Sequence, residues 1–406
     1  MPKPPNILWV VTTQWRAQAC GYAGDLNART PTLDALARAG ADFRHAVTPH
    51  PFGPFARAAL LTGRRSPENG VVDYYDPLPA GAETIAHRLA ARGYATAYFG
   101  KWHLAERDRE APLVGEAHAR MVVPSERRGG FGWWEGFEGG FLLNDPWLHG
   151  SGLPEPRRVP GYQSDVVGAR AAAWIARADE AAERPWFCVV SVEPPHPPYG
   201  APAGAVAPRD PAQIVLAPNV PRDGEVERRA RRELAGYYAH IEATDAAIGR
   251  LLESVDRRTT VVVVTSVHGD MHGAHGLFRK GWPYEESVRV PLLVSVPPAL
   301  AGAGWRGASD ALVSLLDLPR WAESWADGVV PENHAAAQEI SMPSIVALPH
   351  QCDRAWRAVR TGSRKRVWMT TAAEGQGSAG RPWLDFDLER DPLELHNHAA
   401  AAGANA

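Results

Sequence analysis

Four short segments carry side chains that could hold an anion or move a proton, and each one follows an apolar run. They are TTQ (12–14), GKWH (100–103), EPPHPPY (193–199) and SVHGD (266–270). Their most reactive members are Lys101, His103, His196 and His268. Because lysine offers a point charge to an oxyanion and histidine transfers protons near neutral pH, these residue types favour acid–base chemistry on an anionic ligand.

The apolar runs before these segments predict strands of one sheet. Strand patterns cover 6–11, 94–100, 185–192, 259–266 and 290–297, and helical periodicity covers 30–40, 83–93 and 233–255. This alternation predicts an α/β fold in which helices cover both faces of a large, mixed but mostly parallel sheet. Ligands of such sheets bind beyond the carboxyl ends of the strands, so we expect the four segments to meet at one cleft.

A change in the pattern of helix and strand signals near residue 330 predicts two domains. Residues 1–330 form the α/β domain, and residues 331–406 form a small C-terminal subdomain with antiparallel strands at 358–371 and 383–392 and a loop at 331–343. Within the large domain, residues 105–165 show few helix or strand signals. We expect this insertion to lie near the cleft, because long ordered loops are often functional. Its aromatic stretch at 131–141 either packs in the core or forms a substrate-facing wall with Trp133 and Trp134.

Composition narrows the range of partners. The chain has 406 residues and a formal net charge of −3, which gives no basic field for nucleic acid. No apolar run is long enough to span a membrane, and the N-terminus enters a strand without a secretory pattern. The 3 cysteines show no metal-like or paired spacing. We therefore expect a cytoplasmic protein that binds neither nucleic acid nor membrane; its oligomeric state stays open, a dimer included.

Seven segments, in the same order along the chain, resemble those of type I sulfatases of the alkaline phosphatase superfamily. They lie at 5–16, 30–47, 57–64, 93–106, 194–202, 265–294 and 387–397. The resemblance implies the sulfatase-like sandwich with a small C-terminal antiparallel sheet. In that family, a Cys or Ser in C/S-x-P-x-R becomes formylglycine, whose hydrate attacks sulfur. A calcium ion held by Asp-rich loops clamps the sulfate, and Lys, His and Arg side chains neutralise its other oxygens.

This sequence departs from the family pattern at the nucleophile and at the metal. If Arg57 is the motif arginine, Gly53 stands at the nucleophile position, and no Cys or Ser begins an x-P-x-R pattern elsewhere. Thr13 and Val267 stand at carboxylate positions of the metal set, so only Gln14 and His268 remain. Calcium takes six to eight oxygen ligands, so we expect neither a metal nor another cofactor. Asp270 would be a substitute ligand only if its loop were remodelled.

The positions that resemble the family's sulfate-binding and leaving-group residues are retained. The resemblance places Arg57, Lys101, His103, His196 and Lys280 there. We predict a cationic, metal-free pocket without an evident counter-charge, which binds a sulfate, a phosphate or a carboxylate of a small molecule. The predicted catalytic residues are His103, His196, His268, Lys101 and Lys280. The predicted anion contacts are Arg57, Lys101, Lys280, Gln14, Thr13, Gly53, Trp133 and Trp134.

Three functions are compatible with this pattern. The first is an enzyme that releases the anion by elimination or by intramolecular displacement, with histidine moving a proton. The second is an inactive sulfatase-like protein that binds a ligand or a partner. The third is a hydrolase whose nucleophile is Thr12, Thr13 or a water molecule.

Overall fold

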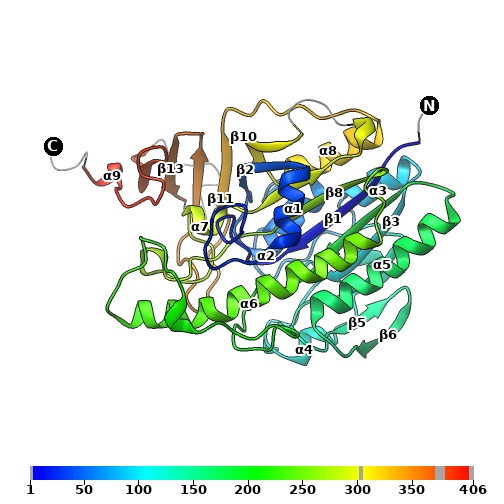
Figure 1. Ribbon diagram of the computed structural model, residues 1–406, viewed down its shortest axis with the longest axis horizontal. Coiled ribbons are helices and arrows are strands. Elements are labelled where there is room, and N and C mark those ends of the chain that lie inside the picture. Colours follow the sequence, from blue (N-terminus) through cyan, green and yellow to red (C-terminus); the bar gives the residue numbers. More distant parts are fainter. Residues whose placement is uncertain (1–2, 301–304, 371–379, 402–406) are drawn as a thin grey trace.

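The centre of the protein is a large mixed sheet, seen in a computed structural model that describes residues 3–300, 305–370 and 380–401 (Figure 1). In sheet order, its strands are β10 (Gly307–Ser314), β2 (Ala41–Val47), β9 (Leu292–Ser295), β8 (Thr260–Ser266), β1 (Asn6–Thr12), β7 (Trp186–Ser191), β3 (Ala95–Lys101), β4 (Trp133–Phe137), β5 (Trp147–Gly150) and β6 (Leu153–Arg158). The central strands β8, β1, β7, β3 and β4 are parallel, whereas β9, β5 and β6 run antiparallel to their neighbours. The predicted mixed, mostly parallel sheet is therefore confirmed.

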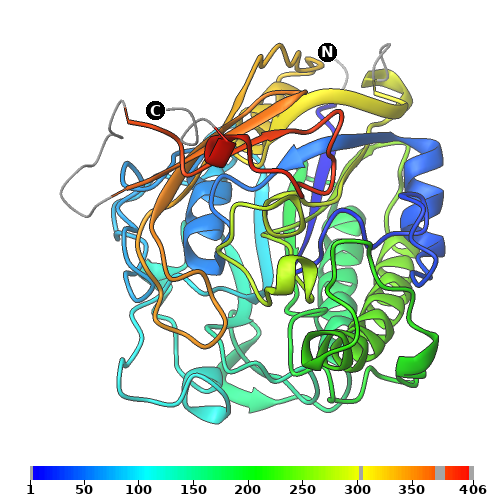
Figure 2. The same cartoon turned by 90° about the vertical axis from the view of Figure 1, so that its left-hand side faces the viewer.

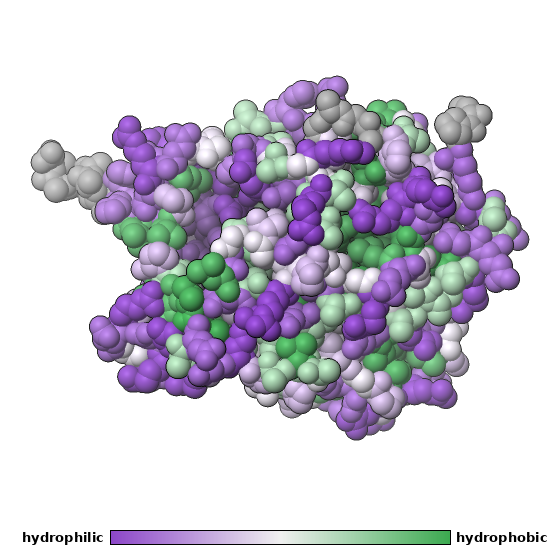
Figure 3. All heavy atoms as spheres, viewed as in Figure 1, coloured by the Kyte–Doolittle hydropathy of each residue, from purple (hydrophilic) through white to green (hydrophobic). Residues whose placement is uncertain are grey.

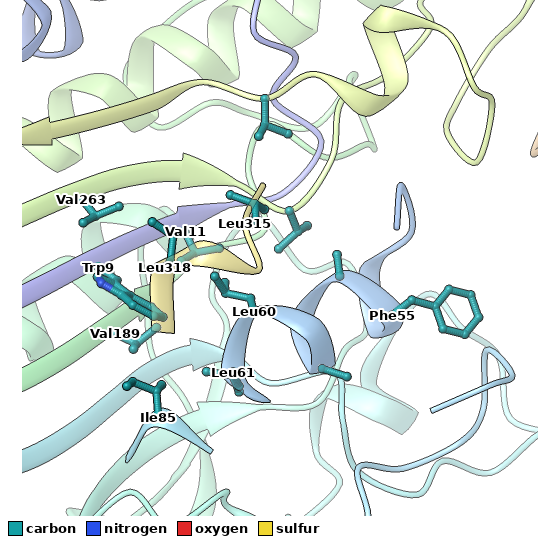
Figure 4. Packing of buried hydrophobic residues seen from close by; sticks show 14 of the residues in the cluster. Trp9, Val11, Phe55, Leu60, Leu61, Ile85, Val189, Val263, Leu315 and Leu318 are labelled. Atoms are coloured by element: carbon teal, nitrogen blue, oxygen red, sulfur yellow. The ribbon is translucent and has the colours of Figure 1, made fainter. Parts of the chain in front are cut away.

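Helices cover both faces of this sheet. One layer holds α1 (Pro31–Ala39), α5 (Gln163–Ala181) and α6 (Glu225–Glu253), and the other holds α2 (Gly53–Thr62), α3 (Ile85–Ala91) and α8 (Asp317–Ala326). The side chains of β1 alternate between two cores: Trp9 packs under the second layer, whereas Val10 packs under the first. Figure 4 shows Trp9 with Leu60 of α2 and Leu318 of α8 in one of these cores.

Shorter elements connect these layers. Single-turn helices are α4 (Glu116–Ala119), α7 (Glu285–Val288) and α9 (His398–Ala401), and short 3₁₀ turns occur at Ser125–Arg127, Pro211–Gln213, Ala274–Gly276 and Pro298–Leu300. No helix in the described part of the chain has both the length and the apolar character needed to cross a membrane. Hydrophilic side chains spread across the face shown in Figure 3, with small apolar groups between them.

A second, antiparallel sheet follows the large one in sequence. Its strands are β11 (Gln338–Met342), β12 (Trp356–Arg360), β13 (Arg364–Met369) and β14 (Leu384–Asp387). It packs beside β10, where the orange and red strands of Figure 2 lie, and shares a hydrophobic core with the large sheet. This sheet confirms the predicted fold class, while the domain boundary at residue 330 stays a prediction. Residues 1–2, 301–304, 371–379 and 402–406 of the two predicted domains lie outside the described residues.

Several local expectations were wrong, and each error has a physical reason. Residues 331–343 include strand β11, and the 105–165 insertion supplies β4, β5 and β6, because pairing with neighbouring strands stabilises short segments that lack a strong local pattern. Helix α5 was not predicted. Helix α6 begins at Glu225 rather than at residue 233, since ion pairs such as Arg231–Glu227, one turn apart, stabilise its charged first turns.

Candidate functional site

A cavity of about 160 Å³ lies at the carboxyl ends of the central strands. All four predicted segments contribute to its wall, since Thr13 follows β1, Lys101 ends β3, His196 follows β7 and His268 follows β8. Three other predicted site residues, Gly53, His103 and Lys280, line the same cavity. The segments therefore meet at one cleft, as the topology of parallel strands predicts.

Gly53 is the first residue of helix α2, and the ring of His103 lies directly against it. A Cβ atom built on Gly53 would be 2.9 Å from Nδ1 of His103, closer than real Cβ atoms approach such atoms. His103 has a left-handed backbone conformation, with φ of 60°. The imidazole therefore occupies the space that a side chain at position 53 would need.

Lys101 has a counter-charge that the sequence-based expectation overlooked. Its Nζ lies 2.5 Å from Oε1 of Glu193, and both side chains are buried. Glu193 also accepts a hydrogen bond of 3.0 Å from Nε2 of Gln163. The prediction of a pocket without counter-charge is thus wrong for Lys101. The signal was available, because Glu193 opens the predicted EPPHPPY segment at the end of a strand.

Lys280 is the cavity cation without a carboxylate partner among the described residues. Its Nζ donates to Oε1 of Gln14 at 3.0 Å and to Nε2 of His196 at 3.2 Å. Burial lowers the pKa of Lys280 to about 7. An anion in the cavity would restore the charged form, because it supplies the missing opposite charge.

Arg57 and Gln14 support the cavity wall but do not line the cavity. The Arg57 guanidinium donates to Oγ1 of Thr13 at 2.8 Å, to Oγ of Ser191 at 2.5 Å and to the Lys101 carbonyl at 3.2 Å. It therefore joins the ends of β1, β7 and β3. In the structure, the hydrogen bonds of Arg57 and Gln14 to protein atoms position other residues, and their direct contact with an anion stays a prediction.

The predicted wall of Trp133 and Trp134 is absent from this cavity. Trp134 is fully buried and packs against Tyr98, while Trp133 is half-buried beneath Arg177. The two residues alternate along β4, so sheet pairing directs their rings to opposite faces of the sheet and away from its end.

Phe141 is the member of the aromatic stretch that does reach the cavity. Its ring stacks on His196 with centroids 4.6 Å apart, and Nζ of Lys101 lies 4.5 Å from the ring centroid. Phe52 and Tyr74 complete the aromatic lining from outside the predicted stretch. No local pattern in the sequence distinguishes these two residues from ordinary core aromatics.

The residues at the family's metal positions do not fit a calcium ion. Val267 offers no donor atom, Thr13 is bonded to Arg57, and the amide oxygen of Gln14 is bonded to Lys280. Asp270 does not substitute, because its carboxylate accepts from the Tyr199 hydroxyl at 2.6 Å and from two backbone amides, and it does not line the cavity. The described ranges contain no group of three or more His, Cys, Asp or Glu side chains placed to hold a metal.

The three cavity histidines are neutral. Burial lowers the pKa of His103, His196 and His268 well below 6.5, and the nearby cation Lys280 lowers each pKa further. Nε2 of His268 is buried and has no hydrogen-bond partner among the described residues. A neutral, unpaired imidazole nitrogen in a cavity wall can accept a proton from a ligand.

Apolar side chains form the outer part of the cavity. Leu113 and Val114 come from the loop before α4, and Leu348 and Pro349 come from the loop between β11 and β12. Val114 and Pro349 are exposed, which places them at the opening. Sequence reasoning missed this apolar rim because its two loops are more than two hundred residues apart in the chain.

Comparisons with known proteins match most of the chain. The family model Sulfatase matches residues 5–329. An ulvan-active sulfatase of Formosa agariphila is 38% identical over 421 residues, covering 98% of this chain and 77% of the relative. A choline-sulfatase of Rhizobium meliloti is 29% identical, covering 97% of this chain and 82% of the relative.

Solved structures share the fold. The YidJ sulfatase structure of Bacteroides fragilis superimposes with a TM-score of 0.82 at 24% identity, covering 98% of this chain and 92% of that one. A phosphonate monoester hydrolase of Agrobacterium radiobacter gives a TM-score of 0.70 at 21% identity, with coverages of 98% and 92%. At these identities the likeness concerns the fold alone.

Proposed function

Because this chain belongs to the sulfatase family, we propose that its cavity binds a small organic sulfate or phosphate ester and releases the anion without a metal or an enzyme nucleophile. The reaction would be an elimination or an intramolecular displacement. The observation that carries the proposal is the buried ammonium of Lys280, which lines the cavity with no carboxylate partner among the described residues.

Three features support anion binding at this position. Lys280 contributes a charge that an oxyanion would compensate, and Lys101 lies in the same wall. Helix α2 begins at Gly53, which lines the cavity, so the positive end of its dipole lies at the cavity wall. A carboxylate would satisfy the same groups, so it is a second class of ligand for this pocket.

The threonines near the site do not resemble nucleophiles. Oγ1 of Thr12 donates to the Thr265 carbonyl at 3.2 Å, and Oγ1 of Thr13 donates to the Val192 carbonyl at 3.0 Å. Each hydroxyl proton is therefore held by a backbone oxygen and not by a base that could remove it. Together with the glycine at position 53, these contacts support a reaction in which the enzyme supplies no covalent group.

The apolar rim supports a small, apolar organic body on the substrate. The names of two relatives, an ulvan-active sulfatase and a choline-sulfatase, indicate anionic esters. The cavity of about 160 Å³ is close to the ~150 Å³ of an engineered cavity that binds benzene. It therefore has room for an anionic group and a few further atoms, with the rest of the molecule against the rim.

Calorimetric titration with inorganic sulfate and phosphate tests the binding step, on protein treated with a chelator. Wild type should bind at least one of these anions, and Lys280→Met should weaken that binding at least about tenfold, because it removes a charge-assisted contact. Lys3→Met, at an exposed position, is the matched control and should bind like wild type. Equal anion affinity in Lys280→Met and wild type would refute the proposal that this cavity binds the anion.

Turnover in water labelled with heavy oxygen tests the reaction class. Small alkyl sulfates that carry a hydrogen on the carbon next to the ester carbon are incubated with the protein, and the masses of both products are measured by mass spectrometry. Elimination or intramolecular displacement leaves both products unlabelled, whereas hydrolysis introduces labelled oxygen into one of them. Labelled product would overturn the proposed reaction. Anion binding without turnover of any ester would instead favour a binding protein.

A further inference from the structure

We propose that the three cavity histidines have distinct roles, which their hydrogen bonds fix before any ligand enters. His268 is the base that removes a proton from the substrate, and His103 is a hydrogen-bond donor to the departing anion. His196 orients the ammonium of Lys280. This division rests on the proposed function and adds to it the acid–base assignment.

His268 lines the cavity and has one ring nitrogen that no described residue bonds to. Its Nδ1 lies 2.9 Å from the Gly269 carbonyl oxygen, and a carbonyl only accepts, so Nδ1 carries the proton. In the neutral ring, Nε2 then carries the lone pair. That atom is buried, belongs to a residue that lines the cavity, and has no partner among the described residues. Of the three imidazoles, His268 is therefore the one prepared to accept a proton.

His103 has the opposite arrangement. Nη1 of Arg107 lies 2.7 Å from its Nε2, and a guanidinium only donates, so the lone pair of Nε2 is already used. The N–H is thus on Nδ1, the atom that faces Gly53 at the start of α2. His103 can donate to an oxyanion there, and it cannot act as a base while Arg107 stays bonded to it.

Arg107 is a positioning residue with contacts of its own. Its Nε lies 3.4 Å from Oε1 of Glu138, and its guanidinium lies over the ring of Tyr74 at 4.4 Å. Glu138 in turn accepts from the backbone amides of Leu104 and Ala105, each at 3.1 Å. These contacts hold Arg107 behind the imidazole and so fix which nitrogen of His103 faces the cavity.

His196 uses both ring nitrogens within the protein. Its Nδ1 donates to the Pro197 carbonyl at 2.8 Å, and its Nε2 accepts from Nζ of Lys280 at 3.2 Å. The ring also stacks on Phe141. Because its lone pair is occupied by Lys280, His196 directs that ammonium toward the anion and does not compete with His268 for the proton.

The proposed step needs no other reactant. In elimination, Nε2 of His268 takes the proton from the carbon next to the ester carbon. The C–H electron pair becomes the new carbon–carbon π bond, and the C–O bond breaks with its pair on the departing sulfate or phosphate. In intramolecular displacement, His268 takes the proton from a hydroxyl or amine of the substrate, whose lone pair forms the new bond to carbon as the same C–O bond breaks. His268 then returns its proton to solvent or to the anion.

Nitrogen NMR of protein labelled in its histidines tests the assignment without any substrate. The signals are identified from the peaks lost in His268→Ala and His103→Ala. Both histidines should be neutral and protonated at Nδ1. The chemical shift of Nε2 should be changed by hydrogen bonding in His103 and should be that of a free imidazole nitrogen in His268. Protonation of His268 at Nε2, or a stoichiometric divalent metal bound at that nitrogen, would overturn the proposal.

Sulfate titration of the same two variants tests the roles separately. His103→Ala should bind inorganic sulfate about five- to tenfold more weakly, because it loses one hydrogen bond to the anion. His268→Ala should bind within about threefold of wild type, because its unprotonated nitrogen offers the anion no donor. The reverse order would overturn the assignment. If wild type binds no sulfate, the proposed function fails, while the NMR spectrum still tests the histidines.

With any ester that wild type converts, His268→Ala should lower kcat by about 10² to 10⁴. Added imidazole should restore part of that activity, because it can supply the missing base, whereas it should not restore His103→Ala. His334→Ala, an exposed histidine, controls for general effects of the substitution. A His268→Ala variant with wild-type kcat would refute the proposed base.

Discussion

Replacing Lys280 by methionine should stabilise the protein near neutral pH, although the same residue is proposed to bind the ligand. Burial lowers the pKa of Lys280 from 10.5 to about 7, which corresponds to about 4 to 5 kcal/mol against the buried ammonium. Methionine removes this penalty. It also leaves Oε1 of Gln14 and Nε2 of His196 without their donor. Leaving these two acceptors unpaired costs about 1 to 3 kcal/mol in total when water from the cavity bonds to one of them. The expected net gain is about 1 to 4 kcal/mol.

The gain should depend on pH in a defined direction. The unfolded chain keeps Lys280 protonated up to its ordinary pKa of 10.5, whereas the folded protein releases that proton near pH 7. Between these values the unfolded state binds more protons, so the stability of wild type rises with pH relative to the variant. The advantage of Lys280→Met should therefore be largest at or below about pH 7 and should be lost on approaching about pH 10.

Urea unfolding followed by tryptophan fluorescence measures this difference, in buffers free of sulfate and phosphate. Lys365→Met is an informative contrast, because Lys365 is equally buried but lies 3.1 Å from Glu285 and 2.6 Å from Glu394. That variant should lose about 3 to 5 kcal/mol, since it leaves buried carboxylates unpaired. If the difference in the free energy of unfolding between wild type and Lys280→Met stays constant from about pH 7 to about pH 10, the reasoning is refuted.

Three further outcomes are expected. Sulfate affinity should fall about tenfold per pH unit above about pH 7, as the amine of Lys280 loses its proton, and titrations across that range check it. Gly53→Ala should displace His103 and weaken sulfate binding measurably by calorimetry, whereas Gly81→Ala, whose Cβ meets no atom within 4 Å, should not. Glu193→Gln should remove the counter-charge of Lys101, tighten sulfate binding about threefold or more, and cost about 3 kcal/mol in urea unfolding.

The fold was largely predictable from local patterns. The run of valines in β8, the alternation of helices and strands, and the ordered family-like segments all concern residues close together in the chain. Local patterns failed where stability comes from distant partners. Strand β4 exists because it pairs with β3, and β11 exists because it pairs with β12, so their own sequences were weak guides.

The candidate site, like the fold, was predictable from the sequence only in part. The sequence by itself determined which chemical groups reach the cleft and which are missing: Lys101, Lys280 and the histidines are present, and the nucleophile and the metal carboxylates are not. Only the tertiary structure decided how those groups are used. It paired Lys101 with Glu193, bonded Arg57 to strand ends, and gave each histidine a different neighbour. Charge compensation, desolvation and hydrogen-bond direction act over a few ångströms between segments far apart in sequence, and only folding sets those distances.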